Sequence, residues 1–302
     1  MKEPYQLCLG TAMWAWTISK KMAFDLLDQW YQAGERCIDT ATNYPINKNS
    51  ADFRKAEQWL KEWIDSTGVS DLKIMVKIGA LSNDGSSINN LRPSFLSINH
   101  QHYSDLFGEQ FDCMMIHWDN REDSAAIDES VQCMESLCSS NQALGFSGIK
   151  HPTAYLPSIK SLRKKPYLQA KQNALQSHLD YYNELIPFAK TIAYGLSGGG
   201  IKLHSDYSNS SSVNQRGLDL DPFKNRIGHL RVSVNTFNQN NPDTPIENMH
   251  QLGMTLAQLD PRIYGILIGP SKPEHLEDTL SFSKRLQTHL SNYEPLKKQL
   301  DG

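Results

Sequence analysis

The sequence predicts an α/β protein, a single (β/α)8 TIM-barrel domain over residues 1–302 with a long loop after the seventh strand. Two observations support this fold. Eight short runs of apolar or β-branched residues recur along the chain, with amphipathic stretches between them, and no shift in composition marks a domain boundary. Regular alternation of this kind implies parallel strands with right-handed crossovers, and eight such units suggest a closed barrel.

The first half of the chain contains four expected strands and four expected helices. The strands are short apolar runs that end in polar or glycine-containing exits such as Asp39-Thr40 and Gly79. We place them at 5–10, 36–39, 73–78 and 111–117. The helices are longer stretches with apolar residues at helical spacing, and they cover 22–33, 50–66, 93–107 and 124–139.

The second half continues the pattern less regularly. Strands are expected at 143–147, 167–173, 191–194 and 263–269, and helices at 244–259 and 272–286. Residues 204–226 are polar and rich in Ser and Asn, which is typical of a functional lid or a disordered segment. Residues 227–243 fit either a helix or an additional strand, and the pattern leaves both open.

The composition excludes several classes of function. Hydrophobic residues make up 39% of the chain and charged residues 21%, as in ordinary soluble proteins. The net charge of −3 gives no basic field for nucleic acid or a membrane surface. We find no run of eighteen apolar residues and no secretory signal, so we expect a cytoplasmic protein. The five cysteines are odd in number, which favours buried thiols over a disulfide framework.

Four ionisable side chains lie at or just past the ends of predicted strands. They are Asp39, Tyr44, Lys77 and His117. In a parallel barrel the carboxyl ends of the strands surround one mouth, so these side chains are expected to share one site. Each alone has a structural interpretation, for instance a loop-capping Asp39 or a core His117. Lys77 is the hardest to explain this way, because an ammonium in a buried strand needs a partner.

Together the four side chains can protonate a carbonyl oxygen. The phenol of Tyr44 has an ordinary pKa of about 10, and a neighbouring ammonium lowers the pKa of such a group. Asp39 would hold Lys77 and offset its burial. His117 would donate a hydrogen bond to the substrate oxygen as negative charge develops on it.

Two other motifs are rejected as sites. His100 and His102 are two apart in a predicted helix, where their side chains diverge, so no metal site is expected. The run GLSGGG at 195–200 lacks the Lys-Ser or Lys-Thr of a phosphate-binding P-loop. Its freed backbone amides can still approach a pyrophosphate closely.

Seven motifs, in order, resemble those of the aldo-keto reductase family over residues 6–286. They are LGTAMWAW (9–16), AGERCIDTATNY (33–44), VKIG (76–79), FDCMMIHWDN (111–120), LGFSG (144–148), QN (172–173) and IGPSKPEHLEDTL (268–280). The resemblance implies an enzyme that reduces an aldehyde or ketone with a nicotinamide cofactor, or runs the reverse reaction. It makes Tyr44 the proton donor, Lys77 and Asp39 its tuning pair, and His117 the orienter of the carbonyl.

The resemblance also implies an extended cofactor across the barrel mouth. Ser147, Gly148 and Gln172 would lie at the nicotinamide carboxamide, and Tyr194 would stack on the ring. The remaining cofactor residues are Thr11, Ala12, Asp39, Gly195, Leu196, Ser197, Gly198, Gly269, Ser271, Lys272, His275 and Asp278. Gly148 and His275 stand where the family has Asn and Arg. Lys272 supplies a cation for a 2′-phosphate, so NADPH is expected, with NADH possible.

The expected substrate is a small carbonyl compound or alcohol. Trp14, Tyr44, His117 and Trp118 would line its pocket, because aromatic rings suit an apolar ligand. We expect a monomer or weak homo-oligomer. Two other interpretations stay open: a slowly reacting redox-sensing subunit that binds the cofactor, and a barrel lyase or isomerase using Lys77 as a Schiff-base nucleophile.

Overall fold

The computed structural model describes residues 6–86, 88–204, 212–215 and 217–301. It contains eight parallel strands that pair in sequence order and close into a barrel, so the predicted (β/α)8 fold is confirmed. The strands are β1 (Gln6–Gly10), β2 (Cys37–Ala41), β3 (Lys73–Ile78), β4 (Phe111–His117), β5 (Ala143–Ser147), β6 (Tyr167–Lys171), β7 (Lys190–Tyr194) and β8 (Ile263–Ile268). Tyr5, the first residue of the first predicted strand, lies outside the described residues.

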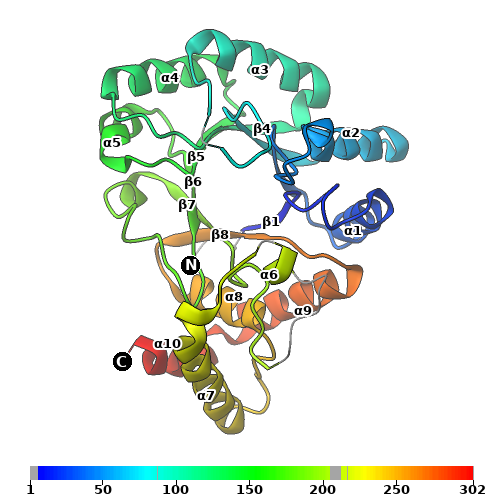
Figure 1. Cartoon of the computed structure of the whole chain (residues 1–302), viewed down its shortest axis with the longest axis vertical. Coiled ribbons are helices and arrows are strands. Elements are labelled where there is room, and N and C mark those ends of the chain that lie inside the picture. Colours follow the sequence, from blue (N-terminus) through cyan, green and yellow to red (C-terminus); the bar gives the residue numbers. More distant parts are fainter. Residues whose placement is uncertain (1–5, 87, 205–211, 216, 302) are drawn as a thin grey trace.

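Helices surround the barrel (Figure 1). They are α1 (Lys20–Gln32), α2 (Lys55–Thr67), α3 (Pro93–Phe107), α4 (Ser124–Leu137), α5 (Pro152–Ser161), α6 (Ser212–Gln215), α7 (Lys224–Asn240), α8 (Met249–Leu259), α9 (Pro273–His289) and α10 (Glu294–Asp301). Short 3₁₀ turns, η1 to η5, cover Ser50–Asp52, Gly108–Gln110, Ile186–Phe188, Asp221–Phe223 and Leu290–Tyr293. Helices α7 and α10 contact each other at one end of the molecule, beyond α8 and α9.

Several predicted boundaries needed correction. The undecided segment 227–243 is helical up to Asn240, where α7 ends, and 241–243 lie in the turn that follows. The predicted helix at 244–259 begins only at Met249, because the Asn248 side chain caps it by accepting from the Gln251 amide at 2.9 Å. The predicted loop 204–226 contains α6 and η4, while 205–211 and 216 lie outside the described residues. Helix α5 was missed, since Pro157 interrupts its helical pattern.

One βα unit departs from the regular pattern. Between β6 and β7 the chain makes a series of turns and the single 3₁₀ turn η3, with no α-helix. The predicted strand 167–173 is also shorter, because β6 ends at Lys171. Gln172 therefore lies in the loop after the strand, and this position decides which way its side chain points.

The barrel interior has an apolar floor. Side chains from neighbouring strands of the closed sheet contact one another there. The cluster consists of Cys8, Cys37, Met75, Cys113, Met115 and Ile192, with Ala143, Tyr167 and Leu267 packed against it. Because side chains alternate between the two faces of a strand, residues two further along also point inward. This alternation directs Asp39, Lys77, His117, Ser147 and Gln169 into the barrel above the floor.

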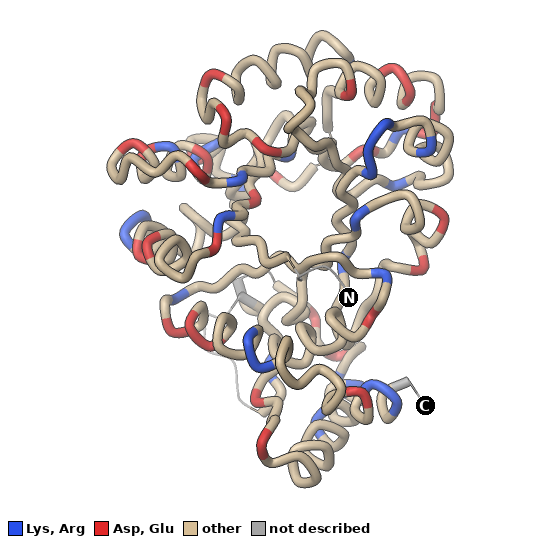
Figure 2. Tube along the Cα trace, turned by 180° about the vertical axis from the view of Figure 1, so that it is seen from behind, with Lys and Arg blue, Asp and Glu red and all other residues tan. Residues whose placement is uncertain are grey.

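Charged residues lie mainly on the outer helices and loops, with acidic and basic positions interspersed (Figure 2). All five cysteines are free thiols. Burial raises the pKa of the Cys8 and Cys113 thiols well above its ordinary value, which keeps both in the unreactive protonated form.

A glycine on α8 allows close approach of the loop that follows β7. A Cβ added to Gly253 would overlap the backbone carbonyl of Leu196. We expect Gly253→Ala to lower the free energy of unfolding by about 1–3 kcal/mol, measured by urea denaturation, because a backbone atom cannot move aside cheaply.

The matched control is Gly228→Ala in helix α7. An added Cβ meets nothing within 4 Å at this position. This change should stabilise the protein by up to ~1 kcal/mol through helix propensity. Equal effects of the two substitutions would contradict the proposed packing.

Candidate active site

The centre of the site is a buried ion pair between neighbouring strands. Lys77 of β3 donates to Asp39 of β2, and the two side chains are 1% and 0% exposed. Burial alone would lower the pKa of Lys77. The carboxylate of Asp39 and the hydroxyl of Tyr44 outweigh that effect, so the pKa of Lys77 is raised. The ammonium is therefore charged inside the barrel.

Tyr44 lies beside this pair. The Lys77 ammonium nitrogen is 4.8 Å from the centroid of the Tyr44 ring, and the tyrosine is 8% exposed. The turn after β2 holds Tyr44 there, because its amide donates to Ala41 O at 3.1 Å and the Thr42 amide donates to Lys77 O at 3.0 Å. The structure thus brings together three of the four predicted catalytic residues.

His117, the fourth, is at the end of β4 and faces the same space. Its ring meets the Tyr44 ring edge-on, with centroids 6.0 Å apart. Burial, and then the nearby Lys77 charge, lower the pKa of His117 well below its ordinary value. The imidazole is therefore neutral near pH 7, and its buried Nδ1 has no hydrogen-bond partner among the described residues. A neutral imidazole can donate from one ring nitrogen only.

Gln169 was missed in the sequence and belongs to the site. Its amide nitrogen donates to the carboxylate of Asp39, and its oxygen accepts from Ser147 Oγ at 3.1 Å. It links β5, β6 and the buried ion pair, and it is 2% exposed. The available signal was alternation along β6, because Gln169 follows the inward-facing Tyr167 by two residues.

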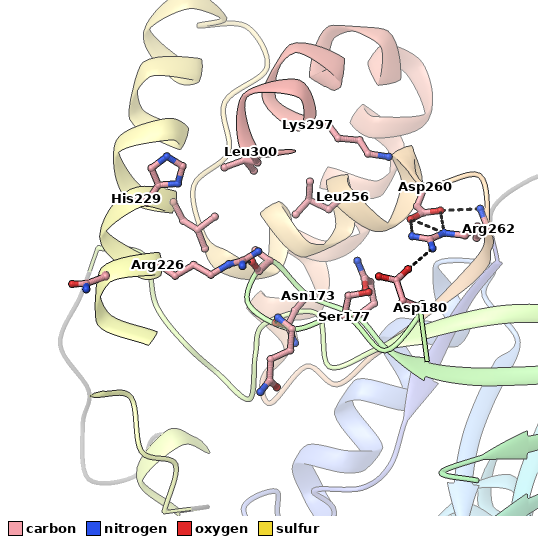
Figure 3. A pocket seen from close by; sticks show the side chains of 15 residues that line it. Asn173, Ser177, Asp180, Arg226, His229, Leu256, Asp260, Arg262, Lys297 and Leu300 are labelled. Carbon is pink, nitrogen blue, oxygen red and sulfur yellow. Dashed lines mark hydrogen bonds and ion pairs between the residues drawn. The ribbon is translucent and has the colours of Figure 1, made fainter. Parts of the chain in front are cut away.

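Gln172, which was expected in this position, lies elsewhere. It is three residues beyond Gln169 and faces the opposite way. It lines a cavity of about 550 Å³ outside the barrel, together with residues of the 173–180 segment, α7, α8 and α10 (Figure 3). We therefore correct the expectation: the inward-facing amide near Ser147 belongs to Gln169.

That outer cavity contains none of the four predicted catalytic residues. Its charged lining includes Arg262, which pairs with Asp260 at 2.7 Å and with Asp180 at 3.0 Å. Arg226 and Lys297 also line it, and each donates to a backbone carbonyl. The cavity is thus separate from the Asp39–Lys77 centre.

The loop after β7 presents backbone to the barrel mouth. Tyr194 is half-buried, and Leu196 is buried against α8. Asn173 Nδ2 donates to Gly195 O at 3.0 Å, and the Gly200 amide donates to Ser197 Oγ at 3.2 Å. The φ angles of Gly195, Gly198, Gly199 and Gly200 are all positive, so this run requires glycine.

The C-terminal motif surrounds the start of α9. Lys272 is its exposed N-cap residue, and Ser271 Oγ lies 3.1 Å from Nδ1 of His275. The Asp278 carboxylate already has hydrogen-bond partners within the protein, because its two oxygens accept from Gln251 at 2.8 Å and from Asn248 at 3.3 Å. An added Cβ at Gly269 would meet nothing within 4 Å. Ser271, Lys272 and His275 are therefore accessible to a ligand, whereas the Asp278 carboxylate is engaged.

Thr11 and Ala12 lie at the exit of β1. Thr11 is fully buried, and its hydroxyl donates to Asp39 O at 3.1 Å and Thr40 Oγ1 at 2.9 Å. That hydroxyl joins β1 to β2 and so supports the position of Asp39. Ala12 is half-buried.

The two predicted substrate tryptophans differ in exposure. Trp14 is fully buried, and its indole N–H has no partner among the described residues. Trp118 is half-buried, and its ring lies on His117 with centroids 4.6 Å apart. Of the two tryptophans, Trp118 is therefore the one that a ligand can reach.

Neither a metal-binding cluster nor a membrane-spanning helix is found among the described residues. No group of three His, Cys, Asp or Glu side chains there is arranged to bind a metal ion. No helix in the same part of the chain is long and apolar enough to cross a membrane.

Comparison with known proteins places these observations in context. The model of the "Aldo/keto reductase family" matches residues 6–294. AAD14 of Saccharomyces cerevisiae, named among the aryl-alcohol dehydrogenases, is 22% identical over 287 residues, covering 87% of this chain and 73% of that protein. Norsolorinic acid reductase stcV of Emericella nidulans is 24% identical over 235 residues, covering 70% of this chain and 57% of that protein. This chain thus spans little more than half of the second relative.

A solved structure agrees in fold. The glycerol dehydrogenase AKR11B4 from Gluconobacter oxydans superposes with a TM-score of 0.68 at 15% sequence identity, covering 96% of this chain and 92% of that chain. At this identity the likeness concerns the fold alone.

The buried ion pair predicts a large effect of removing its negative charge. We expect Asp39→Asn to lower the free energy of unfolding by about 3–5 kcal/mol, because the Lys77 ammonium loses its counter-ion while remaining buried. Urea denaturation at pH 7 measures the loss.

The control is the exposed pair between Lys21 and Asp25, whose side chains are 85% and 37% exposed. Asp25→Asn should cost at most ~1 kcal/mol, since water screens such a pair. If both substitutions cost the same, Lys77 does not carry a buried charge in the folded protein.

Proposed function

Because the chain belongs to the aldo/keto reductase family and is an oxidoreductase, we propose that it is an NADPH-dependent carbonyl reductase in which Tyr44 is the proton donor. The single observation that carries this proposal is the contact between a charged, buried Lys77 and Tyr44. A fixed positive charge beside a phenol stabilises the phenolate that remains after the proton is given up. Asp39 keeps Lys77 in place and in its charged form.

The proton transfer follows from this arrangement. When bound, the dinucleotide supplies a hydride to the carbonyl carbon. Tyr44 gives its hydroxyl proton to the carbonyl oxygen as negative charge develops there, and Lys77 stabilises the phenolate. Neutral His117 donates a hydrogen bond to the same oxygen and orients it. The buried surroundings strengthen both interactions, because little water screens them.

The residues present fit a nicotinamide cofactor. Ser147 Oγ and the Gln169 amide form a buried polar pair beside Asp39, which suits a carboxamide. We assign this role to Gln169 in place of Gln172. The half-buried Tyr194 offers an aromatic face, and the glycine-rich run at 195–200 lets backbone amides approach a pyrophosphate.

The preference for NADPH is supported by the start of α9. Lys272 is an exposed cation there, and Ser271 and His275 lie next to each other. A point charge and a hydroxyl at a helix N-terminus suit a 2′-phosphate. The departure of residue 275 from arginine removes a bidentate contact, so we expect the discrimination against NADH to be modest.

We propose an aromatic or otherwise apolar carbonyl compound as substrate. The names of AAD14 and stcV concern aryl alcohols and norsolorinic acid. In this chain the Trp118 ring lies directly on His117, so an aromatic wall borders the position of the carbonyl oxygen.

Tyr44→Phe tests the proposed proton donor. It should lower kcat for an aryl aldehyde by roughly 10²–10⁴-fold, because general acid catalysis is lost. NADPH binding, followed by fluorescence titration, should stay within about twofold.

The control is Tyr181→Phe at a surface tyrosine that is 51% exposed, and it should leave turnover unchanged. Normal turnover by the Tyr44 variant would reject this mechanism. Tight NADPH binding by the wild type with no turnover on any aldehyde would favour a redox-sensing role instead.

Gln169→Leu and Gln172→Leu test the cofactor site as a pair. Loss of a buried amide partner should weaken NADPH binding by roughly tenfold for Gln169→Leu. Gln172→Leu should leave Kd nearly unchanged, because that side chain lines the outer cavity. Fluorescence titration measures both, and the opposite ranking would restore Gln172 as the cofactor residue.

A further inference from the structure

Gly148 is in direct contact with an aromatic side chain of the site. A Cβ added to Gly148 would lie 2.6 Å from Cδ1 and 3.4 Å from Nε1 of Trp118. The first distance is shorter than any real Cβ contact, so the indole occupies the space where a side chain at 148 would begin. The φ angle of Gly148 is +67°, which also disfavours other residues.

The backbone of Trp118 leaves the indole little freedom to move away. Its own φ angle is +61°, a conformation that bulky residues rarely adopt. Its amide donates to Ser147 O at 3.0 Å, and its carbonyl accepts from Asn89 Nδ2 at 2.6 Å. The Lys150 amide donates to Asp119 O at 2.8 Å, so the exits of β4 and β5 are joined on both sides of Gly148.

Residue 119 adds a further anchor. The Asp119 carboxylate is buried and accepts from Arg121 at 2.8 Å and from the hydroxyl of Tyr155. The conformation at 118 is thus imposed by its neighbours on both sides. If a side chain at 148 pushed the Trp118 indole aside, the backbone at 118 could not shift to restore the position of the ring.

The indole in turn fixes the catalytic imidazole. The His117 ring contacts two aromatic rings, with its centroid 4.6 Å from that of Trp118 and 6.0 Å from that of Tyr44. The buried Nδ1 of His117 has no hydrogen-bond partner among the described residues. Ring packing therefore takes over the orientation that a hydrogen bond at Nδ1 usually provides.

We propose that Gly148 is a positioning residue on the substrate side of the site: by lacking a side chain it lets Trp118 pack on His117 and so orients the imidazole toward the carbonyl oxygen. This inference rests on the proposed carbonyl reductase function. It assigns residue 148 to substrate activation, whereas the sequence pattern assigned it to the cofactor carboxamide. Residues 118 and 148 then form a matched pair, in which a larger residue at 148 requires a smaller one at 118.

A double-mutant cycle of Gly148→Ala and Trp118→Ala tests the inference. Gly148→Ala should lower kcat for an aryl aldehyde by roughly 10–100-fold, as expected when a catalytic group is misplaced, with Kd for NADPH within about twofold. In the Trp118→Ala background the same change should cost less than about threefold, because the overlap is gone. A raised Kd for NADPH, or additive losses of kcat, would overturn the inference.

Thermal unfolding of the same four proteins gives a readout that does not depend on activity. Gly148→Ala should lower Tm more than Gly68→Ala, which has a similar φ of +72° but meets nothing within 4 Å. The excess should disappear in the Trp118→Ala background. If it persists, the two residues are not coupled and the inference fails. If the wild type reduces no carbonyl compound, the proposed function fails. The Tm values of the four proteins still decide whether Gly148 makes room for Trp118.

Discussion

The charge on Lys77 is the constraint on which the rest of the site depends. An ammonium inside a barrel is tolerated only with a counter-ion close by, and Asp39 on the neighbouring strand supplies it. The buried Asp39 carboxylate in turn needs hydrogen-bond donors of its own. The Gln169 amide donates to the second carboxylate oxygen of Asp39, and Ser147 donates to Gln169. One buried charge thus accounts for polar side chains on four strands of the barrel, β2, β3, β5 and β6.

Strand alternation separates this polar layer from an apolar one. Below it the interior is filled by Cys8, Cys37, Met75, Cys113 and other apolar side chains, which give the barrel a dry floor. Electrostatic interactions between the polar side chains above this apolar layer are strong, because little water is present to screen them. The same burial that raises the pKa of the Cys8 thiol lowers that of His117. The site therefore combines a charged amine with a neutral imidazole within one small space.

Glycines control how closely the surrounding loops approach. Gly253 admits the carbonyl of Leu196 against α8, and Gly148 admits the indole of Trp118. In both places atoms of a neighbouring residue fill the space that a side chain at the glycine position would need. At Gly148, where the sequence pattern led us to expect asparagine, the missing side chain leaves room for the ring of Trp118, which directly follows β4.

The sequence by itself determined the eight-stranded barrel and the four groups at or just past its strand ends, Asp39, Tyr44, Lys77 and His117. Those features depend on short-range patterns, namely apolar runs, strand exits and a buried charge that needs a partner. Tertiary structure alone decided that Gln169 and not Gln172 faces inward, because side chains alternate and a small error in a strand end reverses the face. It also decided that 227–240 is helical and that Gly148 meets Trp118. The physical reason is that such contacts join residues distant in sequence, and local pattern carries no information on which neighbour fills a given space.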